Sequence, residues 1–211
     1  MLLQQKIKLG LCLLTFNACQ APEQPALLQE NSTTRLVEVA PVWSPEEQAL
    51  MNKIANRTLL QEVIDQAPQE QMQSIELACS AQMGGVVTYI QKEQELRGIR
   101  LSIAQERAGR STRWYYQNKT TVLVAHEQSQ WQGNQEHLEQ TVFYVDQQEL
   151  LQVLHREVTT APERLETALE KAPFEQVAAQ SQQELWLQLQ AAEEELLTAP
   201  SQKRYTSYFC S

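Results

Sequence analysis

The chain has 211 residues, of which 42% are hydrophobic, and a formal net charge of −9 at pH 7. This length is sufficient for one folded domain with a substantial hydrophobic core. The acidic balance argues against a nucleic-acid-binding protein, because basic side chains that neutralise phosphates supply much of the affinity in that class.

Residues 1–18 have the layout of an export signal. Lys6 and Lys8 precede an apolar run at residues 9–16. This run is much shorter than the roughly 20 residues that span a bilayer as a helix. Small or polar residues follow the run and lead directly to Cys19. A basic, then apolar, then small-residue order is typical of a secretory signal peptide.

Residues 16–19, Phe-Asn-Ala-Cys, resemble the lipobox of bacterial lipoproteins. In that family the cysteine sulfur receives a diacylglycerol group and the signal is cleaved just before it. The resemblance implies that residues 1–18 are removed and that Cys19 becomes a lipidated, palmitate-bearing N-terminus that anchors the chain to the cell envelope. Gln20 is not the aspartate associated with inner-membrane retention, which favours the outer membrane, on either of its faces. A freely secreted or cytosolic chain is the alternative.

Residues 19–43 contain three prolines and no sustained periodicity, which predicts a tether between the anchor and the folded domain. Residues 44–80 are predicted to be helical. Ser44 and Glu47 have the spacing of a capping box that begins a helix, and the helical spacing of apolar residues stops at Pro68. A further short helix is expected in the last part of this range.

Residues 84–156 show apolar side chains at every second position, which is typical of β-strands with one buried and one solvated face. A similar unit occurs three times, and in each unit a tyrosine precedes a leucine by the same interval. The pairs are Tyr89/Leu96, Tyr116/Leu123 and Tyr144/Leu151. Polar residues inside the units predict hairpin turns near 92–95, 117–119 and 146–148. The sequence therefore predicts a single antiparallel meander of about six strands.

Three short motifs mark this region: Gly84-Gly85, Trp114-Tyr115-Tyr116 and Phe143-Tyr144-Val145-Asp146. With them, residues 80–156 resemble a family of small, uncharacterised exported bacterial lipoproteins whose hairpins repeat a Tyr-Tyr-Phe-Asp-x-Gly-x-Leu-like pattern. The resemblance implies a Tyr-rich meander and an envelope location, and it brings no assigned activity. The turn glycine of the pattern is missing from the two later hairpins.

Residues 160–199 are predicted to form helices, because apolar residues recur at helical spacing after Phe174 and Pro200 ends the pattern. Residues 203–210 are a candidate for a final strand. The expected fold class is thus α+β, with helices before and after one sheet in a single domain over residues 44–211.

The four cysteines predict one disulfide bond. Cys12 would leave with the signal and Cys19 would carry the lipid. Cys79 and Cys210 would then remain in an oxidising compartment, where thiols tend to pair. The alternative is that Cys79 is a buried free thiol on a short helix.

The sequence contains no motif of a known catalytic or cofactor site. A sheet could bring His126, His137 and His155 to one rim as zinc or copper ligands. Each is isolated between polar residues, however, which favours solvated histidines at strand ends. We therefore predict no metal, no cofactor, no catalytic residues and no enzymatic activity.

Four aromatic residues are candidates for a ligand-binding face of the sheet: Tyr89, Trp114, Tyr116 and Tyr144. The alternative is that they pack across strands in a core. The expected function is that of a membrane-tethered envelope lipoprotein that serves as an interaction or structural module, with an envelope protein as a candidate partner and no nucleic acid. A carrier or sensor that binds a small molecule or lipid on the aromatic face is the second hypothesis.

Overall fold

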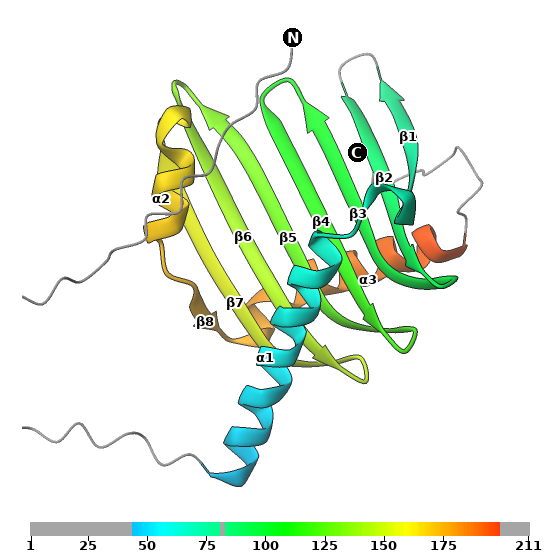
Figure 1. Cartoon of the computed structure of the whole chain (residues 1–211). Coiled ribbons are helices and arrows are strands. Elements are labelled where there is room, and N and C mark those ends of the chain that lie inside the picture. Colours follow the sequence, from blue (N-terminus) through cyan, green and yellow to red (C-terminus); the bar gives the residue numbers. More distant parts are fainter. Residues whose placement is uncertain (1–43, 81–82, 199–211) are drawn as a thin grey trace, which may run out of the picture. The chain divides into compact units, whose positions relative to one another are not determined.

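The computed structural model describes residues 44–80 and 83–198 (Figure 1). One antiparallel sheet contains eight strands in the order of the chain, so each strand pairs with its sequence neighbours. The strands are β1 (Met72–Ser80), β2 (Met83–Lys92), β3 (Glu95–Gln105), β4 (Ala108–Gln117), β5 (Thr120–Gln132), β6 (Gln135–Asp146), β7 (Glu149–Thr160) and β8 (Glu175–Val177). The helices are α1 (Pro45–Asp65), α2 (Leu165–Lys171) and α3 (Gln183–Thr198). The α+β class and the antiparallel meander are confirmed, but the strand count is eight and not six.

The two additional strands lie where helices were expected. In β1, Ile75 and Leu77 face the core while the residue between them is exposed, which is a two-residue period. Ile75 pairs with Val87 of β2, so the segment gains ladder hydrogen bonds that a helix would not supply. At the other edge β8 pairs with β7, and α3 begins after it, at Gln183 rather than near Phe174.

Helix α1 begins as its sequence indicates. The Glu47 amide donates to Ser44 Oγ at 3.2 Å, and the Ser44 amide donates to Glu47 Oε2 at 2.7 Å. This reciprocal pair is a capping box, and it satisfies backbone donors that the first turn of a helix leaves unpaired. The helix runs unbroken to Asp65, ahead of Pro68.

Three tight turns connect the long hairpins at the expected places. Both residues of each turn have positive φ, between 50° and 72°: Glu93-Gln94, Asn118-Lys119 and Gln147-Gln148. Positive φ at both central positions is the geometry of a type I′ hairpin turn. Tyr115 and Tyr144 lie at the same position relative to the turns that follow them, so they correspond in the structural repeat. The sequence repeat matched Tyr116 with Tyr144, but the structural equivalent of Tyr144 is Tyr115, one position earlier.

Both faces of the sheet are covered, although only one buried face was expected (Figure 1). On one face, Trp114 and Phe143 pack beneath α3, and the Phe143 and Trp186 rings lie 5.4 Å apart. On the other face, Ile64 of α1 packs with Tyr115 and its neighbours. We call these the α3 face and the α1 face.

Glycine permits the close approach of α1 to the sheet. A Cβ atom at Gly98 would lie 3.0 Å from Ile64 Cγ2 and 3.3 Å from the Trp114 carbonyl oxygen. A side chain at this position would press on Ile64 and on the Trp114 carbonyl group, which would have to give by a few tenths of an ångström. The lack of a side chain at Gly98 thus allows α1 to pack closely on the sheet.

Several expectations concern residues outside the described part of the chain. These are the signal peptide at residues 1–18, the lipidated Cys19, the tether at residues 19–43 and the strand at 203–210 with Cys210. The backbone of Cys79 lies in β1, but its side chain is not described. Within residues 44–80 and 83–198, no helix has the length and apolar character needed to cross a membrane.

Candidate functional site

The four aromatic residues that were candidates for a ligand face are part of the packed core, as the alternative interpretation had it. Tyr89, Trp114 and Tyr116 lie under α3 and are 6%, 1% and 3% exposed. Tyr144 belongs to the other face, where it is 6% exposed. The Tyr89 hydroxyl donates to the Leu196 carbonyl oxygen at 3.0 Å, which ties this residue to α3. The sheet therefore presents no exposed platform made of these four side chains.

Tyr116 does reach a pocket of about 430 Å³ beside the C-terminal half of α3. Glu193 lines the same pocket and accepts a hydrogen bond from the Thr121 hydroxyl. Burial raises the pKa of Glu193, an effect that the hydrogen bond from Thr121 opposes. Burial also raises the pKa of Tyr116, and the charge of Glu193 raises it further.

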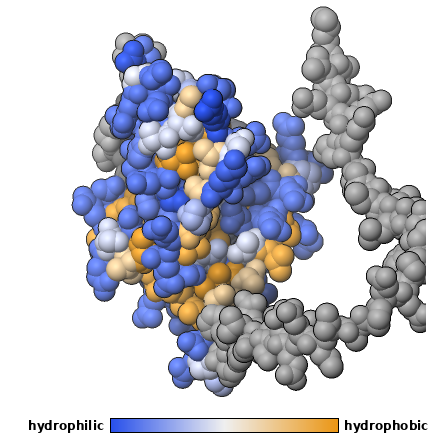
Figure 2. All heavy atoms as spheres, turned by 90° about the vertical axis from the view of Figure 1, so that its left-hand side faces the viewer, coloured by the Kyte–Doolittle hydropathy of each residue, from blue (hydrophilic) through white to orange (hydrophobic). Residues whose placement is uncertain are grey.

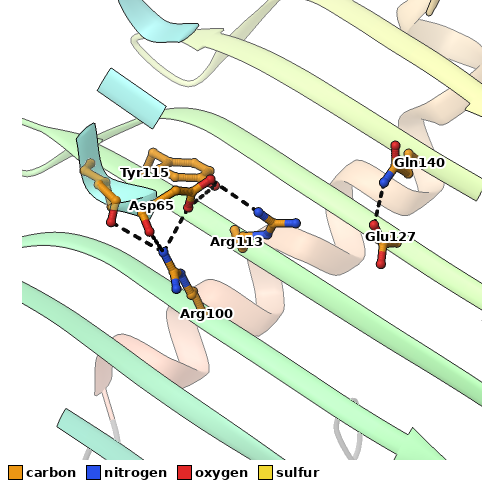
Figure 3. Close-up of polar contacts among 7 residues, drawn as sticks. Asp65, Arg100, Arg113, Tyr115, Glu127 and Gln140 are labelled. Atoms are coloured by element: carbon orange, nitrogen blue, oxygen red, sulfur yellow. Dashed lines mark hydrogen bonds and ion pairs between the residues drawn. The ribbon is translucent and has the colours of Figure 1, made fainter. Parts of the chain in front are cut away.

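An ion cluster on the α1 face holds the C-terminal end of α1 (Figure 3). Arg100 and Arg113 are direct cross-strand partners, and Asp65 lies between their guanidinium groups at 3.0 Å and 3.3 Å. The Tyr115 hydroxyl donates to the same carboxylate at 2.9 Å and 3.1 Å. Burial raises the pKa of Tyr115, and the charge of Asp65 adds to this effect. Asp65 thus supplies a shared counter-charge that reduces the repulsion between the two guanidinium groups across the strands.

A second ion cluster lies further toward the start of α1. Asp146 at the end of β6 accepts from Lys53 Nζ at 2.6 Å and from Arg57 at 3.1 Å. The Lys53 ammonium, through its hydrogen bond, holds the pKa of Asp146 below its ordinary value. Arg57 is only 6% exposed, so it requires this counter-charge.

Between α1 and the chain near Phe174, the α1 face contains a groove of about 420 Å³. The floor of the groove consists of two rows of cross-strand neighbours. The first row has small and aliphatic residues beside Arg113, and the second row has polar residues. The rows are Arg113, Ala125, Val142 and Leu154, and then Glu127, Gln140 and Arg156. Thr58 and Gln61 of α1 form one wall, and Phe174 forms the other. We call this the α1-face groove.

The polar row of the groove is connected by hydrogen bonds. Arg156 Nε donates to Gln140 Oε1 at 2.6 Å. Gln140 Nε2 donates in turn to Glu127, and Figure 3 shows this second hydrogen bond. Arg156 also donates to the Leu169 carbonyl oxygen at 2.7 Å, and its guanidinium lies 4.2 Å from the centre of the Phe174 ring. These contacts fix two charges of opposite sign at known positions on the groove floor.

Apolar side chains gather near this edge of the molecule. Figure 2 views the molecule from the side of β7 and β8 and shows hydrophobic residues in the middle and lower part of a largely hydrophilic surface. Phe174, which lines the groove, is 39% exposed. The groove therefore combines fixed charges with accessible apolar surface.

The three histidines all lie on the α3 face, but the structure does not unite them in one cluster. His126 and His155 occupy equivalent positions, each with Nδ1 hydrogen-bonded to a cross-strand threonine at 2.9 Å and 3.0 Å. Burial, followed by the charge of Arg110, lowers the pKa of His126 to about 4. His137 lies apart from them and pairs with Glu139 at 2.9 Å. His126 is thus a buried neutral histidine and not a solvated one.

Comparison with protein-family models, curated proteins and solved structures found no match to this chain. The resemblance of residues 80–156 to exported lipoproteins therefore stays an expectation from sequence. Among the described residues, those of the α1-face groove and its surroundings bear most directly on function.

Proposed function

We propose that this protein is a membrane-tethered binding module of the bacterial cell envelope, anchored through Cys19, and that it engages its partner through the α1-face groove. One observation carries this proposal: a groove of about 420 Å³ with an aliphatic floor and charged side chains fixed by hydrogen bonds. Ligand sites of about 300–1,000 Å³ commonly combine apolar walls with a few placed polar groups.

The bonding of the charged groups favours recognition over catalysis. Glu127 accepts from Gln140, and Asp65 accepts from two arginines and a tyrosine. A general acid or base needs freedom to exchange its proton with a substrate. A carboxylate held by several donors, as Asp65 is, is instead suited to keeping a constant charge in a constant place.

The groove defines the chemistry of the partner. Arg113 and Arg156 present guanidinium groups at two corners of the floor, and Val142 and Leu154 lie between them. A segment that inserts an apolar side chain and carries a nearby carboxylate matches this pattern, because guanidinium pairs well with carboxylate. We therefore propose a protein segment of this kind as the partner in the envelope.

A carrier or sensor of a small molecule is the second candidate, and the volume of the groove, about 420 Å³, favours it. In this version an anionic amphiphile would occupy the same floor, with its acidic group at the guanidinium corners. The site would then be the α1-face groove, since Tyr89, Trp114 and Tyr116 are covered by α3.

The test is co-purification from detergent-solubilised envelopes with two groove variants. Val142→Trp fills the groove from its floor, and Phe174→Ala removes a wall. We expect both to lose the partner that the wild type retains. Trp131→Ala is the matched control, because Trp131 is an aromatic residue of similar exposure, 42%, that does not line the groove.

The results separate the two candidates. Loss of a single bound protein in both groove variants supports the interaction module, and loss of a bound small molecule, identified by mass spectrometry of the extracted protein, supports the carrier. If the groove variants and Trp131→Ala retain the same partners as the wild type, the groove is not the binding site.

A further inference from the structure

Three side chains that can bind metal meet on the α3 face, away from the groove. His137 and Glu139 come from β6 and Glu157 comes from β7, and one ligand atom of each lies within 4.8 Å of the others. Glu139 and Glu157 are direct cross-strand partners, and His137 lies two positions before Glu139, so all three share one face.

The two glutamates are like charges in direct opposition, which destabilises an antiparallel pair. On the α1 face, the like charges of the opposed Arg100 and Arg113 have an ion of opposite charge, Asp65, between them. On the α3 face, Glu139 pairs with His137. A cation held between the two opposed carboxylates would relieve their repulsion in the same way.

The imidazole is oriented for such a cation. His137 Nδ1 lies 2.8 Å from the Thr159 hydroxyl oxygen, and His137 Nε2 points to Glu139 at 2.9 Å. When Nδ1 donates its proton to Thr159, the lone pair of Nε2 is directed to the space beside the carboxylates. A second hydrogen bond of this kind commonly fixes the tautomer of a metal-binding histidine.

The repeated hairpin shows that the scaffold does not require these residues. When the Asn118 turn is aligned with the Gln147 turn, the equivalent positions on β4 and β5 are Ala108, Arg110 and Gln128. The threonine–histidine pair next to them is kept in both hairpins. The potential ligands are therefore particular to β6 and β7, while the hairpin around them is shared.

We propose that His137, Glu139 and Glu157 bind a divalent transition-metal ion through Nε2 and one oxygen of each carboxylate, with water completing the coordination. The imidazole ligand distinguishes this site from calcium and magnesium sites, which are built from oxygen. Zinc accepts this mixture of nitrogen and oxygen ligands. Any proton on Nε2 is released to solvent when the metal binds.

Isothermal titration of the detergent-solubilised full chain with zinc chloride tests the proposal. Cysteine thiols are alkylated beforehand, so that they cannot supply the ligands. We expect one zinc ion per chain, with affinity reduced about tenfold or more in His137→Ala and in Glu157→Gln. His155→Ala is the matched control, because it removes a histidine of the same face that is outside the cluster.

A variant that gains a second site tests the proposal without altering the three original ligands. Ala108→His, Arg110→Glu and Gln128→Glu together transfer the ligands to the equivalent hairpin, and a second zinc ion per chain is expected. Circular dichroism checks that each variant is folded. Wild-type protein without a zinc-binding phase, or His137→Ala that binds zinc as tightly as the wild type, would overturn the proposal.

Discussion

Asp65 and Asp146 both tie α1 to the sheet, one from the helix and the other from a strand. Asp65 extends from the helix to arginines of the strands, and Asp146 extends from a strand to Lys53 and Arg57 of the helix. They are the only two aspartates in the chain. Because α1 forms one wall of the α1-face groove, these two carboxylates help to position that wall.

Asp65→Asn should lower the free energy of unfolding by about 1–2 kcal/mol, because the opposed Arg100 and Arg113 lose their shared counter-charge. The residue is partly exposed, which limits the effect. Urea unfolding measures it. Glu62→Gln removes a charge from an exposed position of the same helix and should leave the stability close to that of the wild type. Equal stability of the two variants would show that Asp65 does not anchor α1.

Asp146→Asn should lower the melting temperature, because it leaves the buried Arg57 guanidinium without a carboxylate. Arg57→Met in the same background should restore much of the loss, since an apolar side chain of similar length has no charge to compensate. Thermal unfolding followed by circular dichroism tests both. If the double variant is less stable than Asp146→Asn alone, the cost arises from packing and not from the unpaired charge.

The sequence predicted the elements that are specified by residues close together in the chain and that extend over many residues. The capping box of α1, the hairpin turns and the antiparallel pairing all follow from neighbouring residues, and each is present. The strand β8 was missed because three residues are too few to show a two-residue period. The strand β1 was missed because its helical and extended patterns are similar, and pairing with β2 decides between them.

The candidate site could not be predicted in this way. Asp65 meets Arg100 and Arg113 only because α1 crosses the sheet at Gly98, a contact between parts of the chain that are far apart in sequence. The interpretation of Tyr89, Trp114, Tyr116 and Tyr144 as core residues is confirmed. The shift in register between Tyr116 and Tyr144, however, puts these two residues on opposite faces of the sheet. A single useful signal was available: a chain with many glutamates uses aspartate only twice.

Gln148→Gly should stabilise the protein by about 1 kcal/mol, because glycine adopts positive φ without the steric cost that other residues have. Gln148 has a φ of 72° in the β6–β7 turn. Gly133→Ala, at a φ of 67°, should destabilise the β5–β6 turn by a similar amount and serves as the converse control. Urea midpoints provide the comparison. No gain from Gln148→Gly would indicate that this turn does not adopt the type I′ geometry in solution.

His126 should make the stability depend on pH between about 6.5 and 4. Its pKa is lowered to about 4 in the folded protein, so in this interval the unfolded chain binds a proton that the folded protein does not. Stability is therefore full above the unfolded pKa and falls by roughly 3 kcal/mol as the pH drops to about 4. Glu193, whose pKa is raised by burial, acts in the opposite sense.

The contribution of His126 is isolated by comparison with His126→Gln, which can keep the hydrogen bond to Thr112 and does not titrate. The difference in unfolding free energy between the two proteins should shrink or reverse as the pH falls, since Glu193 is common to both. A constant difference across this pH range would mean that His126 is protonated equally in the folded and unfolded states.

The membrane anchor is tested by metabolic labelling with palmitate. Wild-type protein should incorporate the label, and Cys19→Ala should lose it, because the sulfur of this residue is the expected site of acylation. Cys12→Ala is the matched control, since Cys12 lies inside the segment that cleavage would remove, and this variant should label as the wild type does.

An anchored protein should also remain with the membrane fraction at high salt, because acyl chains and not charges retain it. Continued labelling of Cys19→Ala, or an intact N-terminus at Met1 in the wild type, would remove the tether from the proposed function and leave the α1-face groove to be tested alone.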